Sequence, residues 1–246
     1  MLLPWRIFMD GGGKLCYNRH RREAMEDMMK YKAVLFDMDG TVLDTLSDLT
    51  DAMNHTLREF GMPEITRERA AAALGNGAAR YLAGAVPEGT PEELQREMLS
   101  VYAPWYDAHC QIKTAPYRGI PELLARLKAA GVGLAVISNK QDTAVRQLAA
   151  EHFAGLMDFA VGESAAVRRK PNPDAVLSAM RELGAERAEC IYVGDTEVDL
   201  ATAVNAGIDC AAVTWGFRTR EQLITAGATR LFDTAETLGD YLLSMA

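Results

Sequence analysis

The feature that most constrains this chain is a series of short apolar runs, each followed at once by polar or acidic residues. Four such runs lie at 33–36, 133–137, 190–193 and 210–213. Their length and unbroken apolar character are typical of strands buried on both faces of a parallel sheet. Helical patterns lie between them, such as 197–206, which ends at Gly207. The sequence therefore predicts an α/β fold with a doubly wound parallel sheet.

One interval is too long to be a simple connection between two strands. Residues 46–112 contain no convincing strand pattern and are rich in Ala, Leu, Glu and Arg at helical spacing, including 46–60 and 91–110. A crossover helix needs far fewer residues. We therefore expect an inserted helical subdomain, the cap, at 46–112, and an α/β core formed by 31–45 and 113–246.

The first thirty residues differ from the rest of the chain. They contain a run of three glycines, a basic cluster at 19–22 and no sustained periodicity. Such a segment cannot bury enough apolar surface to offset the entropy of ordering. Residues 1–30 are therefore expected to be a disordered N-terminal extension, or to precede a start at Met28 or Met29.

Composition and charge exclude several classes of protein. A formal net charge of −8 with no long Lys/Arg run disfavours nucleic acid and anionic lipid as partners. No apolar run approaches the roughly 18 residues that would span a bilayer. The four cysteines are widely spaced, which argues against a zinc or dithiol site. We expect a cytoplasmic protein with no nucleic-acid or membrane partner, and the oligomeric state stays open.

Two acids follow the first apolar run directly. Asp37 and Asp39 lie at the expected carboxyl end of a strand, where open α/β sheets bind their ligands. They project from the same side of an extended chain, and their mutual repulsion calls for a metal cation or a shared proton. The alternative is a plain turn at 39–41, which leaves the acid inside the strand end unexplained.

Polar residues follow the other buried runs in the same way. Asp195 comes after the run at 190–193, and Asp199 lies four residues later on the expected helix, where capping alone is the alternative. Ser138 and Asn139 end the run at 133–137 and offer a hydroxyl and helix-start N–H groups to a phosphate. Lys170 lies in a proline-stiffened basic segment, which would otherwise be an ordinary solvated loop.

Together these motifs resemble those of the haloacid dehalogenase (HAD) superfamily, and the insertion resembles the cap of its phosphoglycolate phosphatase-like subfamily. The resemblance covers about residue 31 to the end of the chain. It rests on four motifs in order, namely Asp37-Met38-Asp39-Gly40-Thr41, Ser138, Lys170-Pro171, and Gly194-Asp195 through Asp199.

The resemblance implies a catalytic role for the acids. Asp37 would attack phosphorus to form an aspartyl-phosphate, and Asp39 would act as general acid and then general base. Mg²⁺ would be held by the Asp37 carboxylate, the Asp39 backbone carbonyl and Asp195, with Asp199 supporting that shell.

The resemblance also implies how the substrate is held. Ser138, Asn139 and Lys170 would bind the phosphoryl oxygens. The substrate would be a small phosphorylated metabolite, with 2-phosphoglycolate as the best single candidate. Pyrophosphate hydrolysis, a β-phosphoglucomutase-like phosphomutase and a non-catalytic phospho-acceptor regulatory domain are the alternatives.

Selectivity for the substrate is expected to come from residues of the cap. Gly75-Asn76-Gly77 interrupts an Ala-rich helical stretch, and its glycines permit a backbone shape that brings N–H groups to an anion. Arg80 follows within one turn. A plain helix–helix turn is the alternative, although the segment resembles the equivalent one in phosphoglycolate phosphatases. Trp215-Gly216-Phe217 resembles segments of those enzymes and of related pyrophosphatases.

Overall fold

The structure is a computed structural model and describes residues 30–244. Except for its last residue, the predicted extension at 1–30 lies outside the described residues. The core is a parallel sheet of six strands in the order β5-β4-β1-β6-β7-β8. The strands are β1 Ala33–Asp37, β4 Gly133–Gln141, β5 Phe159–Glu163, β6 Cys190–Gly194, β7 Asp209–Val213 and β8 Leu231–Phe232.

The four predicted strands are confirmed as β1, β4, β6 and β7. The sequence reading missed β5 and β8, which form the two edges of the sheet. Edge strands pair on one side only, so neither presents the continuous apolar run that marks a buried strand. β4 is also longer than expected, because its pairing with β5 resumes at Gln141 and Glu163 after an irregularity that follows Ile137.

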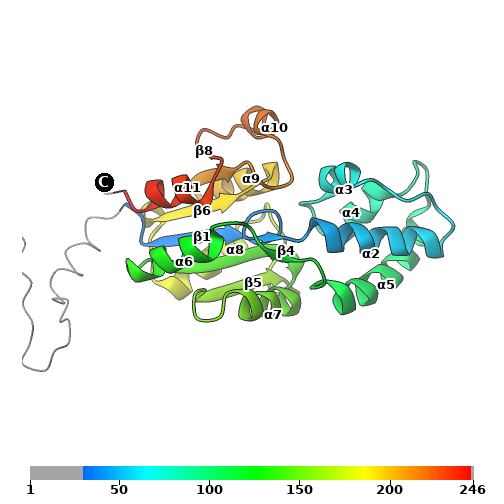
Figure 1. Ribbon diagram of the computed structural model, residues 1–246, viewed down its shortest axis with the longest axis horizontal. Helices are drawn as coiled ribbons and strands as arrows, with labels where there is room; N and C mark the ends of the chain where they lie inside the picture. Colours follow the sequence, from blue (N-terminus) through cyan, green and yellow to red (C-terminus); the bar gives the residue numbers. More distant parts are fainter. Residues whose placement is uncertain (1–29, 245–246) are drawn as a thin grey trace, which may run out of the picture.

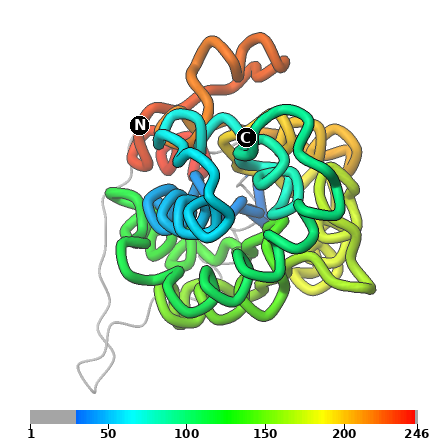
Figure 2. The backbone as a smooth tube through the Cα atoms, turned by 90° about the vertical axis from the view of Figure 1, so that its right-hand side faces the viewer, coloured from blue at the N-terminus to red at the C-terminus, as the bar shows by residue number. Residues whose placement is uncertain are grey.

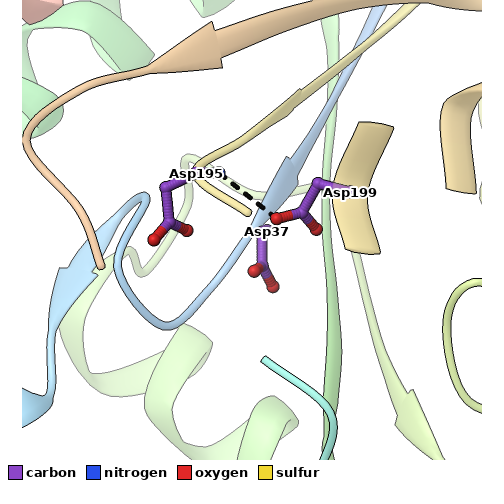
Figure 3. Close-up of side chains that lie close together, drawn as sticks. All are labelled: Asp37, Asp195 and Asp199. Atoms are coloured by element: carbon purple, nitrogen blue, oxygen red, sulfur yellow. Dashed lines mark hydrogen bonds between the residues drawn. The ribbon is translucent and has the colours of Figure 1, made fainter. Parts of the chain in front are cut away.

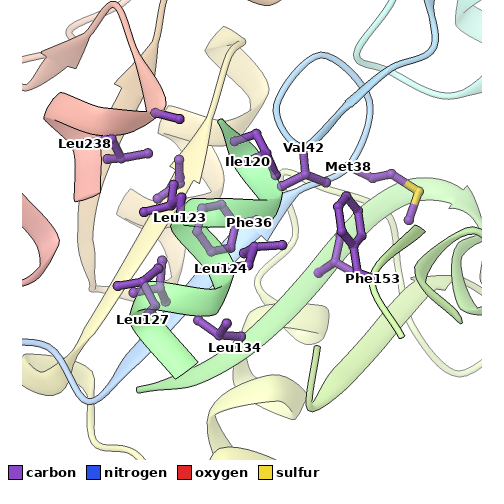
Figure 4. Packing of buried hydrophobic residues seen from close by; sticks show 14 of the residues in the cluster. Phe36, Met38, Val42, Ile120, Leu123, Leu124, Leu127, Leu134, Phe153 and Leu238 are labelled. Carbon is purple, nitrogen blue, oxygen red and sulfur yellow. The ribbon is translucent and has the colours of Figure 1, made fainter. Parts of the chain in front are cut away.

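Helices cover both faces of the sheet, which confirms the doubly wound α/β fold. One apolar cluster packs α6, α7 and α11 on one face, and a second packs α8 and α9 on the other. Figure 4 shows part of the first cluster, with Phe36 of β1 among the leucines of α6. The core helices are α6 Ile120–Ala129, α7 Asp142–His152, α8 Asp174–Leu183, α9 Glu197–Ala206, α10 Arg220–Thr225 and α11 Ala235–Leu242, with a 3₁₀ turn at Arg187–Glu189.

Four helices fill the interval assigned to the cap. They are α2 Leu46–Glu59, α3 Arg67–Ala73, α4 Ala78–Ala85 and α5 Glu92–His109. They lie beside one end of the sheet (Figures 1 and 2) and share an apolar cluster of their own. The division of the chain into domains at 46 and 112 stays a prediction. Within residues 30–244, no helix is both long and apolar enough to cross a membrane.

The chain leaves the core and returns to it through two adjacent short strands. β2 Leu43–Asp44 pairs antiparallel with β3 Ala115–Pro116. Asp48 in the first turn of α2 reinforces the junction, because its buried carboxylate accepts hydrogen bonds from the N–H groups of Lys113 and Thr114 and from the Thr114 hydroxyl. The helical segment is therefore held to the core at both of its ends.

Candidate active site

The centre of the site is set by the register of β1 between its two neighbours. Asp37 pairs with Ile137 of β4, and Phe36 pairs with Val193 of β6. Ser138, the next residue within β4, and Asp195, the residue after β6, are therefore brought to the same end of the central strands as Asp37. The predicted strand end is confirmed for Asp37 and Asp195, whereas Ser138 lies inside β4, which continues to Gln141.

Asp37 is buried at the end of β1, with 6% of its surface exposed. Its Oδ1 lies 2.8 Å from the Nζ of Lys170 and accepts a 2.7 Å hydrogen bond from the N–H of Met38. Burial raises the pKa of the Asp37 carboxyl well above its usual range, the charge of Asp199 raises it further, and Lys170 opposes both. Its other oxygen, Oδ2, makes no side-chain or backbone hydrogen bond to the described residues.

Two more carboxylates lie close to Asp37. Oxygen atoms of Asp37, Asp195 and Asp199 all lie within 4.8 Å of one another (Figure 3), and all three side chains are buried. Asp195 accepts hydrogen bonds from the hydroxyl of Thr41 at 2.8 Å and from the N–H of Phe217 at 2.7 Å. Burial and the charge of Asp199 raise the pKa of Asp195 to about 7, although these hydrogen bonds oppose the shift.

Asp199 caps the helix on which it lies. Its Oδ2 accepts hydrogen bonds from the N–H groups of Asp195 and Thr196 and from the Thr196 hydroxyl. Its Oδ1 accepts a 2.7 Å bond from Lys170. The sequence reading set capping against a functional role, but Asp199 combines the two, because one oxygen closes the helix start and the other faces the acid cluster.

Lys170 is the buried cation of this cluster. Its Nζ contacts Asp37, Asp199 and the hydroxyl of Tyr192. Burial opposes its charge, yet the carboxylates of Asp199 and Asp37 outweigh that effect and raise the Lys170 pKa well above its usual value. Asn139 holds the backbone in place, since its Oδ1 accepts from the Lys170 N–H at 2.6 Å and its Nδ2 donates to the Lys170 carbonyl at 3.2 Å.

Asp39 lies nearer to the solvent than the other acids. Ser138 donates a 3.4 Å hydrogen bond to its Oδ2, and the Nζ of Lys140 lies 3.2 Å from its Oδ1. The helix start predicted at 138–140 is wrong, because β4 continues to Gln141 and α7 begins at Asp142. Ser138 is therefore a hydroxyl donor within β4 and not a helix cap.

The donor set fits a hard divalent cation. Three buried carboxylates face one ammonium, that of Lys170, so the cluster has excess negative charge when all the acids are ionised. The raised pKa values of Asp37 and Asp195 are the physical sign of that excess. An ion of the Mg²⁺ type, which binds carboxylate oxygen, would relieve it.

A cavity of about 910 Å³ lies between these strand ends and the cap. Asp37, Asp39, Ser138 and Asn139 line it on the core side, whereas Lys170 lies behind them. Its cap side is more apolar and aromatic, with Leu49, Leu74, Tyr81, Leu99, Tyr102 and Tyr106.

The cap segment predicted to select the substrate reaches this cavity in part. Gly75 and Gly77 line it, and both have positive φ angles, 112° and 79°. The carbonyl of Gly75 accepts a hydrogen bond from Asn139, and that of Asn76 accepts one from Arg169. The segment thus docks on the core as well as linking α3 to α4. Arg80 is exposed and does not line the cavity.

The sequence reading gave no role to several residues that shape the site. Thr41 and the N–H of Phe217 hold Asp195, as described above. A Cβ atom at Gly40 or Gly216 would lie 2.3 Å from Asp195 Oδ2, so only glycine fits at these two positions. The sequence feature that could have pointed to Gly40 and Gly216 is that each lies in the short segment directly after a buried strand, β1 or β7.

Comparison with known proteins agrees with this geometry. The family model of the haloacid dehalogenase-like hydrolases matches residues 34–213. The chain belongs to this family. The resemblance drawn from the four motifs is thereby confirmed, and the protein is a hydrolase.

Individual relatives narrow the comparison within the family. Phosphoglycolate phosphatase 1 of Pseudomonas aeruginosa is 33% identical, over 84% of this chain and 78% of the relative. The N-acetylmuramic acid 6-phosphate phosphatase of the same organism is also 33% identical, over 77% of this chain and 84% of the relative. A crystal structure from Lactobacillus delbrueckii subsp. bulgaricus, provisionally classed as a phosphoglycolate phosphatase, has a TM-score of 0.85 and 41% identity, covering 88% of this chain and all of that one.

Proposed function

We propose that the protein is a Mg²⁺-dependent phosphatase that hydrolyses 2-phosphoglycolate through an aspartyl-phosphate on Asp37, in the cytoplasm. The observation that carries the proposal is the position of Asp37. Its carboxylate lines the cavity beside Lys170, with Asp195 and Asp199 within 4.8 Å, so a nucleophile, a cation and a metal site converge at one strand end.

Asp37 and Asp39 divide the chemistry between them. Asp37 attacks phosphorus, and its bond to the phosphoryl group forms as the bond to the ester oxygen breaks. Asp39, two residues further on and facing the same cavity, donates a proton to the leaving oxygen and then takes one from the water that hydrolyses the aspartyl-phosphate.

The other polar residues hold the phosphoryl group and the nucleophile. Lys170 orients Asp37 through their 2.8 Å contact and supplies positive charge behind it. The Ser138 hydroxyl faces the cavity next to Asp37, whereas the Asn139 amide is committed to the Lys170 backbone and the Gly75 carbonyl and so supports the phosphoryl site through them.

Mg²⁺ fits the acid cluster, and we place it on the carboxylates of Asp37 and Asp195 and the backbone carbonyl of Asp39. Asp199 orients this set through its bonds to Lys170 and to the N–H of Asp195. When bound, the ion neutralises phosphoryl charge and polarises the phosphorus–oxygen bonds.

The choice of 2-phosphoglycolate is supported by the relatives named for that substrate and by the docked cap. Gly75 and Gly77 bring the backbone of the cap against Asn139 and Arg169 at the cavity rim, which would exclude water from a small anionic substrate.

A larger phosphomonoester is the second candidate. The cavity of about 910 Å³ lies near the upper end of the 300 to 1,000 Å³ common for small-molecule sites, and its cap side is aromatic and aliphatic. The N-acetylmuramic acid 6-phosphate phosphatase among the relatives acts on a substrate of this larger kind.

A substrate panel tests the proposal. Phosphate release is measured with 2-phosphoglycolate, N-acetylmuramic acid 6-phosphate, pyrophosphate and β-glucose 1-phosphate, with Mg²⁺ and with excess chelator. We expect the highest kcat/KM for 2-phosphoglycolate and reversible loss of activity on chelation. A clear preference for any other member of the panel contradicts the named substrate, and full activity in chelator contradicts the metal.

The variant Asp37→Asn tests the nucleophile. A neutral amide cannot form the covalent intermediate, so we expect turnover to fall to background while the circular dichroism spectrum is unchanged. Asp209→Asn is the matched control, because Asp209 is the first residue of β7 and lies at the opposite end of the parallel strands from Asp37, the last residue of β1. Retained turnover in Asp37→Asn would show that phosphoryl transfer does not pass through this residue.

A further inference from the structure

Lys140 is a cation of the cavity to which the reaction described above assigns no task. It follows Ser138 and Asn139 on β4, and only 10% of its side chain is exposed. Its Nζ lies 3.2 Å from Oδ1 of Asp39 and donates a 2.6 Å hydrogen bond to the hydroxyl oxygen of Tyr106. It also lies 4.5 Å from the centre of the Tyr106 ring. Lys140 therefore stands between the acid of the core and an aromatic residue of the cap.

Tyr106 presents a second donor at the same place. It lies on α5, is buried and lines the cavity. Burial and the charge of Asp39 raise the pKa of its hydroxyl, so the proton is retained. The hydroxyl oxygen accepts from Lys140, and its own O–H donates to no residue within 30–244. An ammonium from the core and a hydroxyl from the cap thus face the cavity together.

The other nearby cations are held by contacts away from Asp39. Of the described residues that line the cavity, Lys140 and Arg169 carry positive charge. Arg169 pairs with Glu163 through two nitrogens, at 3.1 and 2.9 Å, and donates to the carbonyl of Asn76. Lys170 is buried between Asp37 and Asp199. A second anionic group of a substrate would therefore meet Lys140.

The position of Lys140 next to Asp39 matches the shape of a phosphorylated 2-hydroxy acid. Asp39 must reach the ester oxygen in order to protonate it. In 2-phosphoglycolate one methylene group separates that oxygen from the carboxylate carbon. The carboxylate consequently has to lie beside Asp39, where the ammonium of Lys140 and the hydroxyl of Tyr106 are found.

We propose that Lys140 and Tyr106 form the site that binds the substrate carboxylate and so determine specificity for phosphorylated acids. The proposal rests on the phosphatase function above and adds the group that recognises the non-phosphate end. Because one donor belongs to the core and the other to the cap, a bound carboxylate joins the two parts. A phosphomonoester without a carboxylate offers no acceptor to this pair of donors and leaves Lys140 with its contacts to Asp39 and Tyr106.

The test compares two substrates of equal length, 2-phosphoglycolate and ethyl phosphate, which differ by the carboxylate. The readout is the ratio of their kcat/KM values in the full-length, Mg²⁺-loaded protein. In Lys140→Met, which keeps the length and apolar stem of the side chain, we expect this ratio to fall on the order of 10- to 100-fold, as for loss of a charged hydrogen bond. If Lys140 only supports Asp39, both substrates lose the same factor, and an unchanged ratio overturns the proposal.

Two further variants serve as a control and as a second test of the proposal. Arg169→Gln removes the other cation of the cavity and should leave the ratio unchanged, so a fall in this variant with none in Lys140→Met also overturns the proposal. Tyr106→Phe keeps the ring and deletes the hydroxyl, and we expect it to lower the ratio several-fold. If Lys140→Met fails to fold, Tyr106→Phe carries the test, with an unchanged ratio as the contrary result.

The wild-type protein separates this inference from the function on which it rests. Equal kcat/KM for the two substrates contradicts carboxylate recognition but leaves the phosphatase intact. Absence of activity on both, and on the wider panel, contradicts the phosphatase function itself.

Discussion

Replacing Asp195 with asparagine should make the metal-free protein more stable at pH 8 while removing its activity. Asp195 is fully buried beside Asp199, and its pKa is raised from 3.8 to about 7. A carboxyl whose folded-state pKa lies above its unfolded value destabilises the fold once it is ionised in both states. The resulting loss of unfolding free energy is complete above about pH 7, where the carboxyl is ionised in both states, and absent below about pH 3.8, where it is protonated in both.

The size of the effect follows from that shift. About three pKa units at 1.36 kcal/mol each correspond to about 4 kcal/mol. The amide of Asp195→Asn can accept from the N–H of Phe217 and donate to the hydroxyl of Thr41, but it loses charge-assisted bonds worth about 1 to 2 kcal/mol. The net gain in unfolding free energy is therefore about 2 to 3 kcal/mol at pH 8, and it disappears toward pH 4.

Urea unfolding in excess chelator at pH 8 and pH 4.5 measures this difference. Adding Mg²⁺ at 100 times its dissociation constant should then raise the unfolding free energy of the wild-type protein by about 2.7 kcal/mol. The increase should be smaller for the variant, because it lacks the metal-binding carboxylate of Asp195. Asp48→Asn is the control, because its buried carboxylate serves three donors away from the acid cluster and should lose about 1 to 3 kcal/mol. A wild-type protein at least as stable as Asp195→Asn in chelator at pH 8 would refute the reasoning.

Three other substitutions, one of them with a control variant, test further parts of the site. Asp39→Asn should lower kcat about 100-fold or more, since proton transfer to the leaving oxygen is lost, and rapid-quench kinetics would reveal an unchanged rate if another group supplies the proton. Gly216→Ala drives a Cβ to 2.3 Å from Asp195 Oδ2, so the Mg²⁺ concentration for half-maximal activity should rise at least about tenfold. Gly133→Ala, whose nearest neighbour is a flexible leucine at 3.2 Å, should leave that concentration unchanged. Arg218→Met removes hydrogen bonds to two cap carbonyls and the pair with Glu197, and should lower the unfolding free energy by about 1 to 3 kcal/mol, measured by urea titration.

Much of the core was predictable because its signals are local. A buried parallel strand is a continuous apolar run, and the residue after it lies at the edge of the sheet whatever the rest of the chain does. That is why Asp37, Ser138 and Asp195 were placed near one another from the sequence. The edge strands β5 and β8 were missed because their pairing on one side leaves no such run.

The contacts between distant segments depended on the tertiary structure. Nothing local to Phe217 shows that its N–H holds Asp195, and nothing local to Lys140 shows that it meets Asp39 and Tyr106. The sequence by itself determined which polar groups stand at strand ends, since backbone geometry alone puts them there. Only the folded chain decided which of them touch, because that depends on how the loop after β7 crosses the sheet edge and how α5 packs over the cavity.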